Sequence, residues 1–147
     1  MHTSLLLTHS VFRYFVLVFL LLFVFRSLQG WINKSSFSSL DDKLGFWLFM
    51  VAHTQLIIGF VLYFISPVVV FSGESMKDAS ARYWLVEHGS MMILAIVLIT
   101  LARVTTKKIT DSTAKYKRLF IYNGIAFVII IVAILHSGRG FLNLPSL

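Results

Sequence analysis

The 147-residue sequence contains no cysteine. This absence excludes disulfides, iron–sulfur clusters, thiolate metal sites and covalently attached c-type haem. Charged residues are also scarce, at 13% of the chain, whereas soluble domains carry about a quarter. Hydrophobic residues make up 58% instead. We therefore expect the chain to lie in a lipid bilayer, where any metal or cofactor must bind to histidine, methionine or carboxylate side chains.

The motifs of soluble enzymes are missing as well. The sequence has no glycine-rich nucleotide loop, no HExxH helix and no Ser-His-Asp arrangement. A cleaved signal peptide is not expected either, because residues 1–4 hold no basic side chain and no small-residue cleavage site follows the first apolar run. A stand-alone enzyme is therefore not indicated, and the first apolar segment is expected to remain as a helix.

Four apolar segments each reach the roughly 20 residues that a bilayer core requires. They cover about residues 5–25, 44–66, 82–104 and 119–140. The connections between them are short, so the simplest arrangement is an all-α, up-down four-helix bundle that forms a single transmembrane domain over residues 1–147. Pro67 is expected to end the second helix, and the run Ser39–Asp42 is expected to cap its start.

The basic residues predict the orientation in the membrane. Nine of the thirteen Lys and Arg residues lie in or beside the first and third connections: Arg26, Lys34, Lys43, Arg103, Lys107, Lys108, Lys115, Lys117 and Arg118. Basic loops stay in the cytoplasm, so both termini are expected to face the opposite, outer side of the membrane. This placement at helix ends also explains the net charge of +7 without nucleic acid as a partner. The third connection is, secondarily, a candidate surface for anionic lipid.

Ionisable side chains within the four segments are the main candidates for a site, because each is costly in hydrocarbon unless it faces the bundle interior. They are His9, Arg13, His53, Glu87, His88, His136 and Arg139. With a rise of about 1.5 Å per residue, His9 and His88 lie roughly 6 and 9 Å below the outer end. Because the first and third helices are diagonal in an up-down bundle, these two imidazoles could face each other, as a bis-histidine haem requires.

Other roles for these residues stay open. His53 lies roughly 20 Å deep, near mid-membrane. Arg13 could pair with Glu87, or with a haem propionate. A metal or proton site built from His53, Glu87 and His88 is a further alternative, and each histidine could simply form hydrogen bonds between helices. Aromatic residues near the helix ends are expected to form an interfacial belt, namely Trp31, Trp47, Tyr63, Tyr83, Trp84, Tyr116 and Tyr122.

Three segments resemble a group of small four-helix membrane proteins of Bacteroidetes-type bacteria labelled cytochrome b-like. They are residues 9–14 (HSVFRY), 53–59 (HTQLIIG) and 86–92 (VEHGSMM), and the resemblance covers nearly the whole chain. It implies haem b held by histidines, with His9, His53 and His88 at the matching positions. It also implies a bacterial inner membrane, in which both termini would be periplasmic. His136 lies outside the family pattern.

The leading hypothesis is therefore a haem b protein of electron transfer, with one haem or more. His9 and His88 are the expected axial ligands, His53 is the alternative axial ligand, and Arg13 is a further cofactor-binding residue. Because little of the chain would lie outside the lipid bilayer, a larger respiratory or other membrane complex is the expected partner, with a quinone as a candidate. The alternative is an accessory subunit without cofactor that stabilises such a complex.

Overall fold

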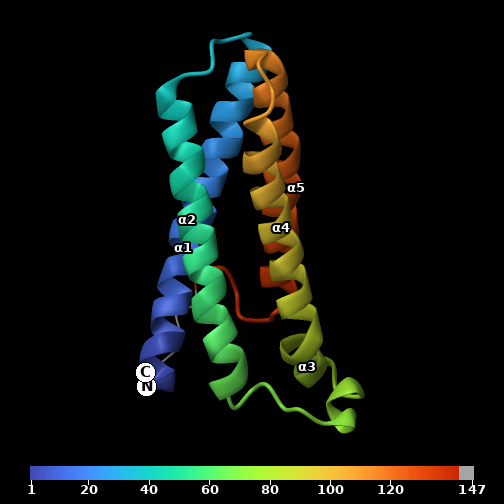
Figure 1. Ribbon diagram of the computed structural model, residues 1–147. Helices are drawn as coiled ribbons and strands as arrows, with labels where there is room; N and C mark the ends of the chain where they lie inside the picture. Colours follow the sequence, from blue (N-terminus) through green and yellow to red (C-terminus); the bar gives the residue numbers. More distant parts are fainter. Residues whose placement is uncertain (143–147) are drawn as a thin grey trace.

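The computed structural model describes residues 1–142, which contain four helices long and apolar enough to cross a membrane (Figure 1). Helix α1 covers His2–Ile32, α2 covers Ser39–Ile65 and α5 covers Ser112–His136. The third span combines the single turn α3 (Ala79–Arg82), a π-helical turn (Tyr83–Glu87) and helix α4 (His88–Thr106). A 3₁₀ turn, Gly73–Met76, lies in the connection between α2 and α3.

The helices form the predicted up-down bundle. Helix α1 packs against α2 and α5, and α4 packs against the same two helices, so α1 and α4 are diagonal. The N-terminus and the end of α5 lie at one end of the bundle, whereas the two short connections, 33–38 and 107–111, lie at the other (Figure 1). We call these the terminal end and the loop end.

The helices extend beyond the predicted apolar segments. Helix α1 has 31 residues, about 46 Å at 1.5 Å per residue, which exceeds a hydrocarbon core of about 30 Å. Helix α2 ends at Ile65, before Pro67 as predicted. Its start differs, because Ser38 is the N-cap and forms a reciprocal capping box with Asp41. Helix α5 ends at His136, earlier than predicted, and Gly138 follows with a φ of 68°.

Small residues line the bundle interior. Ala95 and Ala102 on α4, and Ala126 and Ala133 on α5, are almost fully buried and are seven residues apart on each helix. A seven-residue repeat keeps these side chains on one face, and their small size lets α4 and α5 approach closely. The α4–α5 contact is accordingly the most extensive in the bundle.

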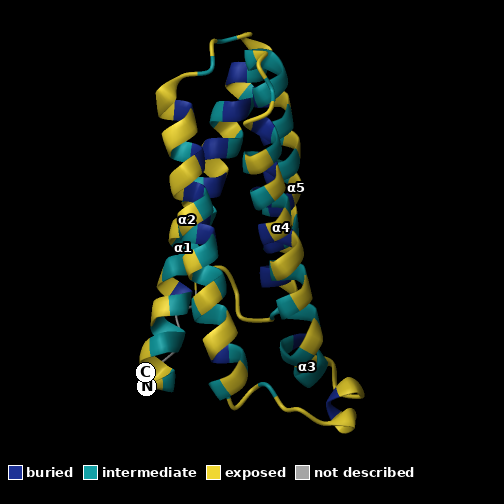
Figure 2. Ribbon diagram, in the orientation of Figure 1, coloured by how far each residue is buried: buried dark blue, intermediate teal, exposed yellow. Residues whose placement is uncertain are grey.

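Large apolar side chains cover the outside. Phe15, Leu22, Ile57 and Val128 are each about 60% exposed, and Figure 2 shows exposed residues along the outward faces of the long helices. A soluble protein rarely presents such a continuous apolar surface to water. The outward faces are therefore suited to contact with lipid.

Candidate functional site

Two histidines from diagonal helices meet inside the bundle, toward the terminal end. The imidazoles of His9 on α1 and His88 on α4 have ring centroids 6.5 Å apart, with their planes at 72°. Both residues are half-buried. The rise per residue predicts a similar depth for the two histidines, and in the structure their rings do lie side by side.

Helix α2 holds His9 in place through two residues one turn apart. The side-chain amide of Gln55 donates to the His9 carbonyl oxygen at 2.9 Å. At Gly59, a Cβ atom would lie 3.0 Å from Cε1 of His9. The imidazole therefore packs directly on the α2 backbone, in a space that exists because residue 59 has no side chain.

The π-helical turn places Tyr83 beside His88. Residues five apart point about 140° away from each other around an α-helix. In a π-helix, whose hydrogen bonds join residues five apart, that angle falls to roughly 50°. The Tyr83 hydroxyl accordingly lies 3.3 Å from Nδ1 of His88. The ring of Trp84 also packs on His88, with centroids 5.4 Å apart.

The hydroxyl of Tyr83 determines which nitrogen of His88 carries a proton. Tyr83 has one hydroxyl hydrogen, which it donates to the carbonyl oxygen of Ala133 on α5. Toward His88 the hydroxyl can then only accept, so Nδ1 of His88 must be the donor. The neutral ring therefore keeps a lone pair on Nε2. A hydrogen bond of this kind is typical of histidines that ligate metals.

Two contacts stabilise the π-helical turn. Nε of Arg82 lies 2.8 Å from Oε1 of Glu87, an ion pair between residues five apart. From α2, the Tyr63 hydroxyl donates to the carbonyl oxygen of Leu85 at 2.9 Å. Of the two alternatives for Arg13, the pairing with Glu87 is not formed, because Arg82, the residue just before the π-helical turn, pairs with that carboxylate.

Arg13 instead faces the bundle interior beside a small cavity. Its Nη2 donates to the Tyr14 hydroxyl at 3.1 Å, and its buried Nε has no hydrogen-bond partner among residues 1–142. Oε1 of Gln55 and Nδ1 of His9 are buried without a partner in the same range. Arg13 and Gln55 both line the cavity, which has a volume of about 40 Å³. That space holds one to three water molecules.

The other two predicted histidines lie elsewhere. His53 bonds through Nδ1 to the Phe49 carbonyl oxygen at 2.8 Å, and its Nε2 lies 3.4 Å from the Thr100 hydroxyl. Because Thr100 follows His88 by twelve residues, His53 lies about 18 Å along α4 from His88. His136, the last residue of α5, is exposed.

The centroid distance between the two imidazoles is close to the value for two rings that share one metal ion. An imidazole nitrogen binds a metal at about 2 Å, so two rings in line with one ion have centroids roughly 6 Å apart. His9 and His88 match this value. Within residues 1–142, no three His, Asp or Glu side chains come together in a group that could hold a metal ion. The structure therefore does not form a metal site with three or more protein ligands in this range. The alternative site of His53, Glu87 and His88 is thus not assembled.

A second buried polar cluster lies at the loop end. Asp41, 1% exposed, accepts hydrogen bonds from Arg26 Nε at 2.8 Å and from the Tyr116 hydroxyl at 2.6 Å. The backbone and hydroxyl of Ser38 donate to it as well. Gly30 gives the Tyr116 ring its space, since a Cβ atom there would lie 2.6 Å from three ring atoms. We call Arg26, Ser38, Asp41 and Tyr116 the aspartate cluster, and His9, Arg13, Gln55, Tyr83 and His88 the histidine cluster.

Sequence reasoning missed both tyrosines of these clusters. Tyr83 and Tyr116 were assigned to the interfacial belt, but they are 4% and 1% exposed and form hydrogen bonds inside the bundle. The five-residue spacing from Tyr83 to His88 is a signal that only a π turn makes meaningful. No protein-family model, curated protein or solved structure matches the chain.

Proposed function

We propose that this chain binds a b-type haem between His9 and His88 and takes part in electron transfer, as a small subunit or partner of a respiratory or other membrane complex. The observation that carries the proposal is the pair of interior imidazoles with centroids 6.5 Å apart. A six-coordinate haem needs two such side chains and no third protein ligand. The resemblance to cytochrome b-like proteins includes these two histidines and also His53, so the choice of His9 and His88 as the pair rests on their contact in the bundle.

Four of the five residues of the histidine cluster have a part in this proposal. His9, seated on Gly59, and His88, held by Tyr83, would provide the axial nitrogens. Arg13 would hold a propionate, since its buried Nε has no partner among the described residues. Bound haem would supply one-electron chemistry. The chain's own residues fix the two imidazoles, through the packing of His9 on Gly59 and the contact of His88 with Tyr83.

The deciding experiment is a dithionite-reduced minus oxidised absorption spectrum of protein purified after expression with ample haem. We expect the sharp alpha band of b-type haem. His9→Ala and His88→Ala should lose it, whereas the matched controls His53→Ala and His136→Ala should keep it. A colourless wild-type protein would sink the proposal. Loss of the band in His53→Ala but not in His9→Ala would move the ligand pair to His53 and His88.

The second candidate function is an accessory subunit without cofactor, and one observation favours it. The cavity beside Arg13 measures about 40 Å³, which is enough for a few water molecules and not for a macrocycle. Hydrogen bonds from Gln55, Tyr63 and Tyr83 would then serve to join the helices. In this case His9→Ala and His88→Ala should weaken assembly with a larger complex and remove no absorption band.

The proposed orientation places the loop end in the cytoplasm of a bacterium and both termini in the periplasm, as the basic residues predict. The absence of cysteine makes a direct test possible. Ser36→Cys in the first connection and Ser80→Cys in α3 introduce single thiols at exposed positions. A membrane-impermeant maleimide added to spheroplasts should label Ser80→Cys at once, and Ser36→Cys only after lysis. The opposite pattern would reverse the orientation.

A further inference from the structure

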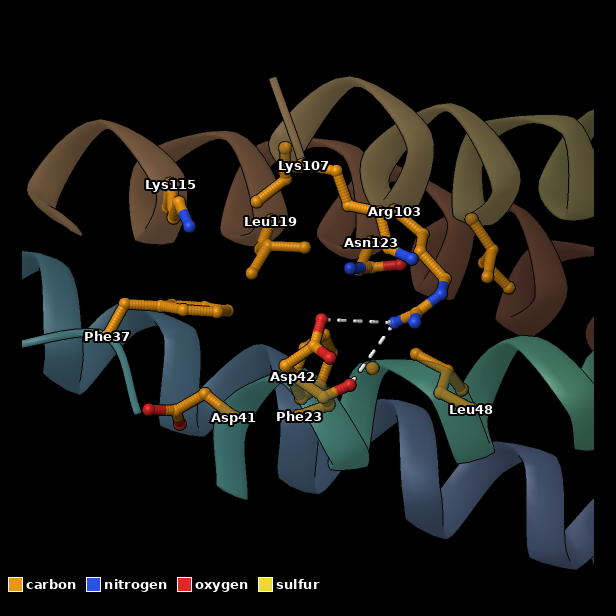
Figure 3. A pocket seen from close by; sticks show the side chains of 13 residues that line it. Phe23, Phe37, Asp41, Asp42, Leu48, Arg103, Lys107, Lys115, Leu119 and Asn123 are labelled. Carbon is orange, nitrogen blue, oxygen red and sulfur yellow. Dashed lines mark hydrogen bonds and ion pairs between the residues drawn. The ribbon is translucent and has the colours of Figure 1, made fainter. Parts of the chain in front are cut away.

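A cavity of about 40 Å³ opens at the loop end, far from the histidine cluster. Helix α2 contributes Asp42, α4 contributes Arg103 and α5 contributes Asn123, and Lys107 and Lys115 come from the two sides of the third connection. Figure 3 shows these side chains around one space, with Phe37 and Leu119 as apolar walls. Asp42 and Lys107 are exposed, so the cavity reaches the surface.

The charges around this cavity leave two cations without a counter-ion. Arg103 donates to the Asp42 carbonyl oxygen at 3.2 Å, and its Nη1 lies 3.7 Å from the Asp42 carboxylate. Asp41 is paired with Arg26, and Figure 3 shows its carboxylate turned away from Arg103 and Asn123. Lys107 and Lys115 form no ion pair among residues 1–142. The cavity mouth is therefore positively charged.

The floor of the cavity holds polar groups that need a partner. Thr106 and Asn123 are 5% and 1% exposed and line the cavity. Neither the Thr106 hydroxyl nor Oδ1 of Asn123 has a hydrogen-bond partner within the described part of the chain. Leaving such groups unpaired costs about 1–3 kcal/mol each. A ligand that brings hydroxyl groups, or water carried with it, would remove this cost.

We infer that the cavity binds the headgroup of an anionic glycerophospholipid whose phosphate is followed by free hydroxyls, as in phosphatidylglycerol. The phosphate is recognised by Lys107 and Lys115, and the glycerol hydroxyls bond to Thr106 and Asn123. The cavity lies at the end of membrane-spanning helices, where lipid phosphates lie, and basic pockets between such helices bind acidic headgroups. This inference does not depend on haem binding.

The test measures binding of short-chain phosphatidylglycerol to the full chain in a zwitterionic detergent, by thermal shift and native mass spectrometry. The double variant Lys107→Gln/Lys115→Gln should lower the affinity about 30-fold. Lys34→Gln/Lys108→Gln is the matched control, because it removes the same charge from the same end outside the cavity. Asn123→Leu keeps both cations and should abolish the preference for phosphatidylglycerol over phosphatidic acid.

Three outcomes would overturn the inference. If both double variants lose affinity for phosphatidylglycerol equally, the lipid is attracted by the overall positive charge of the loop end and not by the cavity. Equal stabilisation by phosphatidylcholine, whose phosphate is followed by a choline cation, would mean that neither the net negative charge nor the glycerol hydroxyls are recognised. If inorganic phosphate alone stabilises the protein as strongly as phosphatidylglycerol, the site takes a soluble anion and the lipid assignment is wrong. Because Lys107 is exposed and Lys115 half-exposed, the double variant should fold normally.

Discussion

The aspartate cluster joins α1, α2 and α5 at the loop end, and the histidine cluster joins α1, α2 and the third span toward the terminal end, but the polar atoms of the two clusters differ in how far they are paired. In the aspartate cluster, the Asp41 carboxylate receives hydrogen bonds from Arg26, Ser38 and Tyr116. In the histidine cluster, Nδ1 of His9, Nε of Arg13 and Oε1 of Gln55 have no partner among residues 1–142.

This difference separates a stabilising cluster from one suited to binding. A buried polar group with its full set of hydrogen bonds contributes to stability, whereas an unpaired one lowers it by about 1–3 kcal/mol. The aspartate cluster joins α1, the first connection, α2 and α5 and leaves nothing for a ligand to bind. The histidine cluster holds groups whose bonding capacity only a further molecule can use, which is why we propose the function there.

The largest effect is expected from Asp41→Ala. This change leaves Arg26 without its acceptor, leaves the Tyr116 hydroxyl with only the Ser36 carbonyl oxygen, and removes the capping box of α2. The free energy of unfolding should therefore fall by about 3 kcal/mol. Reversible unfolding of the purified protein in mixed micelles measures it. The neighbouring Asp42→Ala loses only a 3.7 Å pair at a half-exposed carboxylate and should cost less than about 1 kcal/mol. Equal losses in the free energy of unfolding of the two variants would mean that the aspartate cluster stabilises the protein no more than the Asp42–Arg103 pair does.

Gly30→Ala tests the close contact of Tyr116 with α1. A methyl group 2.6 Å from the ring must displace it, which should lower the free energy of unfolding by about 2 kcal/mol. Gly124→Ala is the control, because a Cβ there meets no atom within 4 Å. That variant should be neutral or more stable, and a similar loss in both would indicate a general intolerance of helix substitution.

Tyr83→Phe removes the hydroxyl that pairs with His88 and Ala133, the best-satisfied contact of the histidine cluster. The loss in the free energy of unfolding should be intermediate, about 1 kcal/mol, because one hydrogen-bonding group is deleted. The haem-loaded variant should also show a shifted midpoint potential, since Nδ1 of His88 loses its acceptor. An unchanged potential in a loaded variant would show that Tyr83 has a packing role alone.

His9→Leu should have the smallest effect on the protein without haem. It replaces a ring with an unpaired Nδ1 by an apolar side chain, so the free energy of unfolding should change by less than about 0.5 kcal/mol or rise. Thermal unfolding of protein expressed without haem supply would measure this. A loss as large as that of Asp41→Ala would make the histidine cluster a structural one.

Most of the fold could be predicted from the sequence, because apolar runs of bilayer length leave few arrangements for four short-connected helices. That His9 and His88 could meet was also predictable, from their similar depth and from the diagonal placement of their helices in an up-down bundle. The π turn could not be predicted, since the residues 83–87 carry no composition signal for it. Tyr116 was misplaced because an aromatic residue near a helix end suits both an interfacial belt and a buried contact, and only packing against Gly30 distinguishes them.

The π-helical turn also makes the third span tolerant of a change in its length. A π turn holds one residue more than an α-helical turn, so deletion of one of the residues 84–86 would let the span close into a continuous α-helix. Four α-helical steps turn the chain by about 400°, close to the roughly 410° of the five π-helical steps they replace, so the residues before the deletion would keep their orientation relative to α4. Arg82 and Glu87 would then be four residues apart and would still share a face, as would Tyr83 and His88. The π turn therefore carries an extra residue without turning the two parts of the third span away from each other.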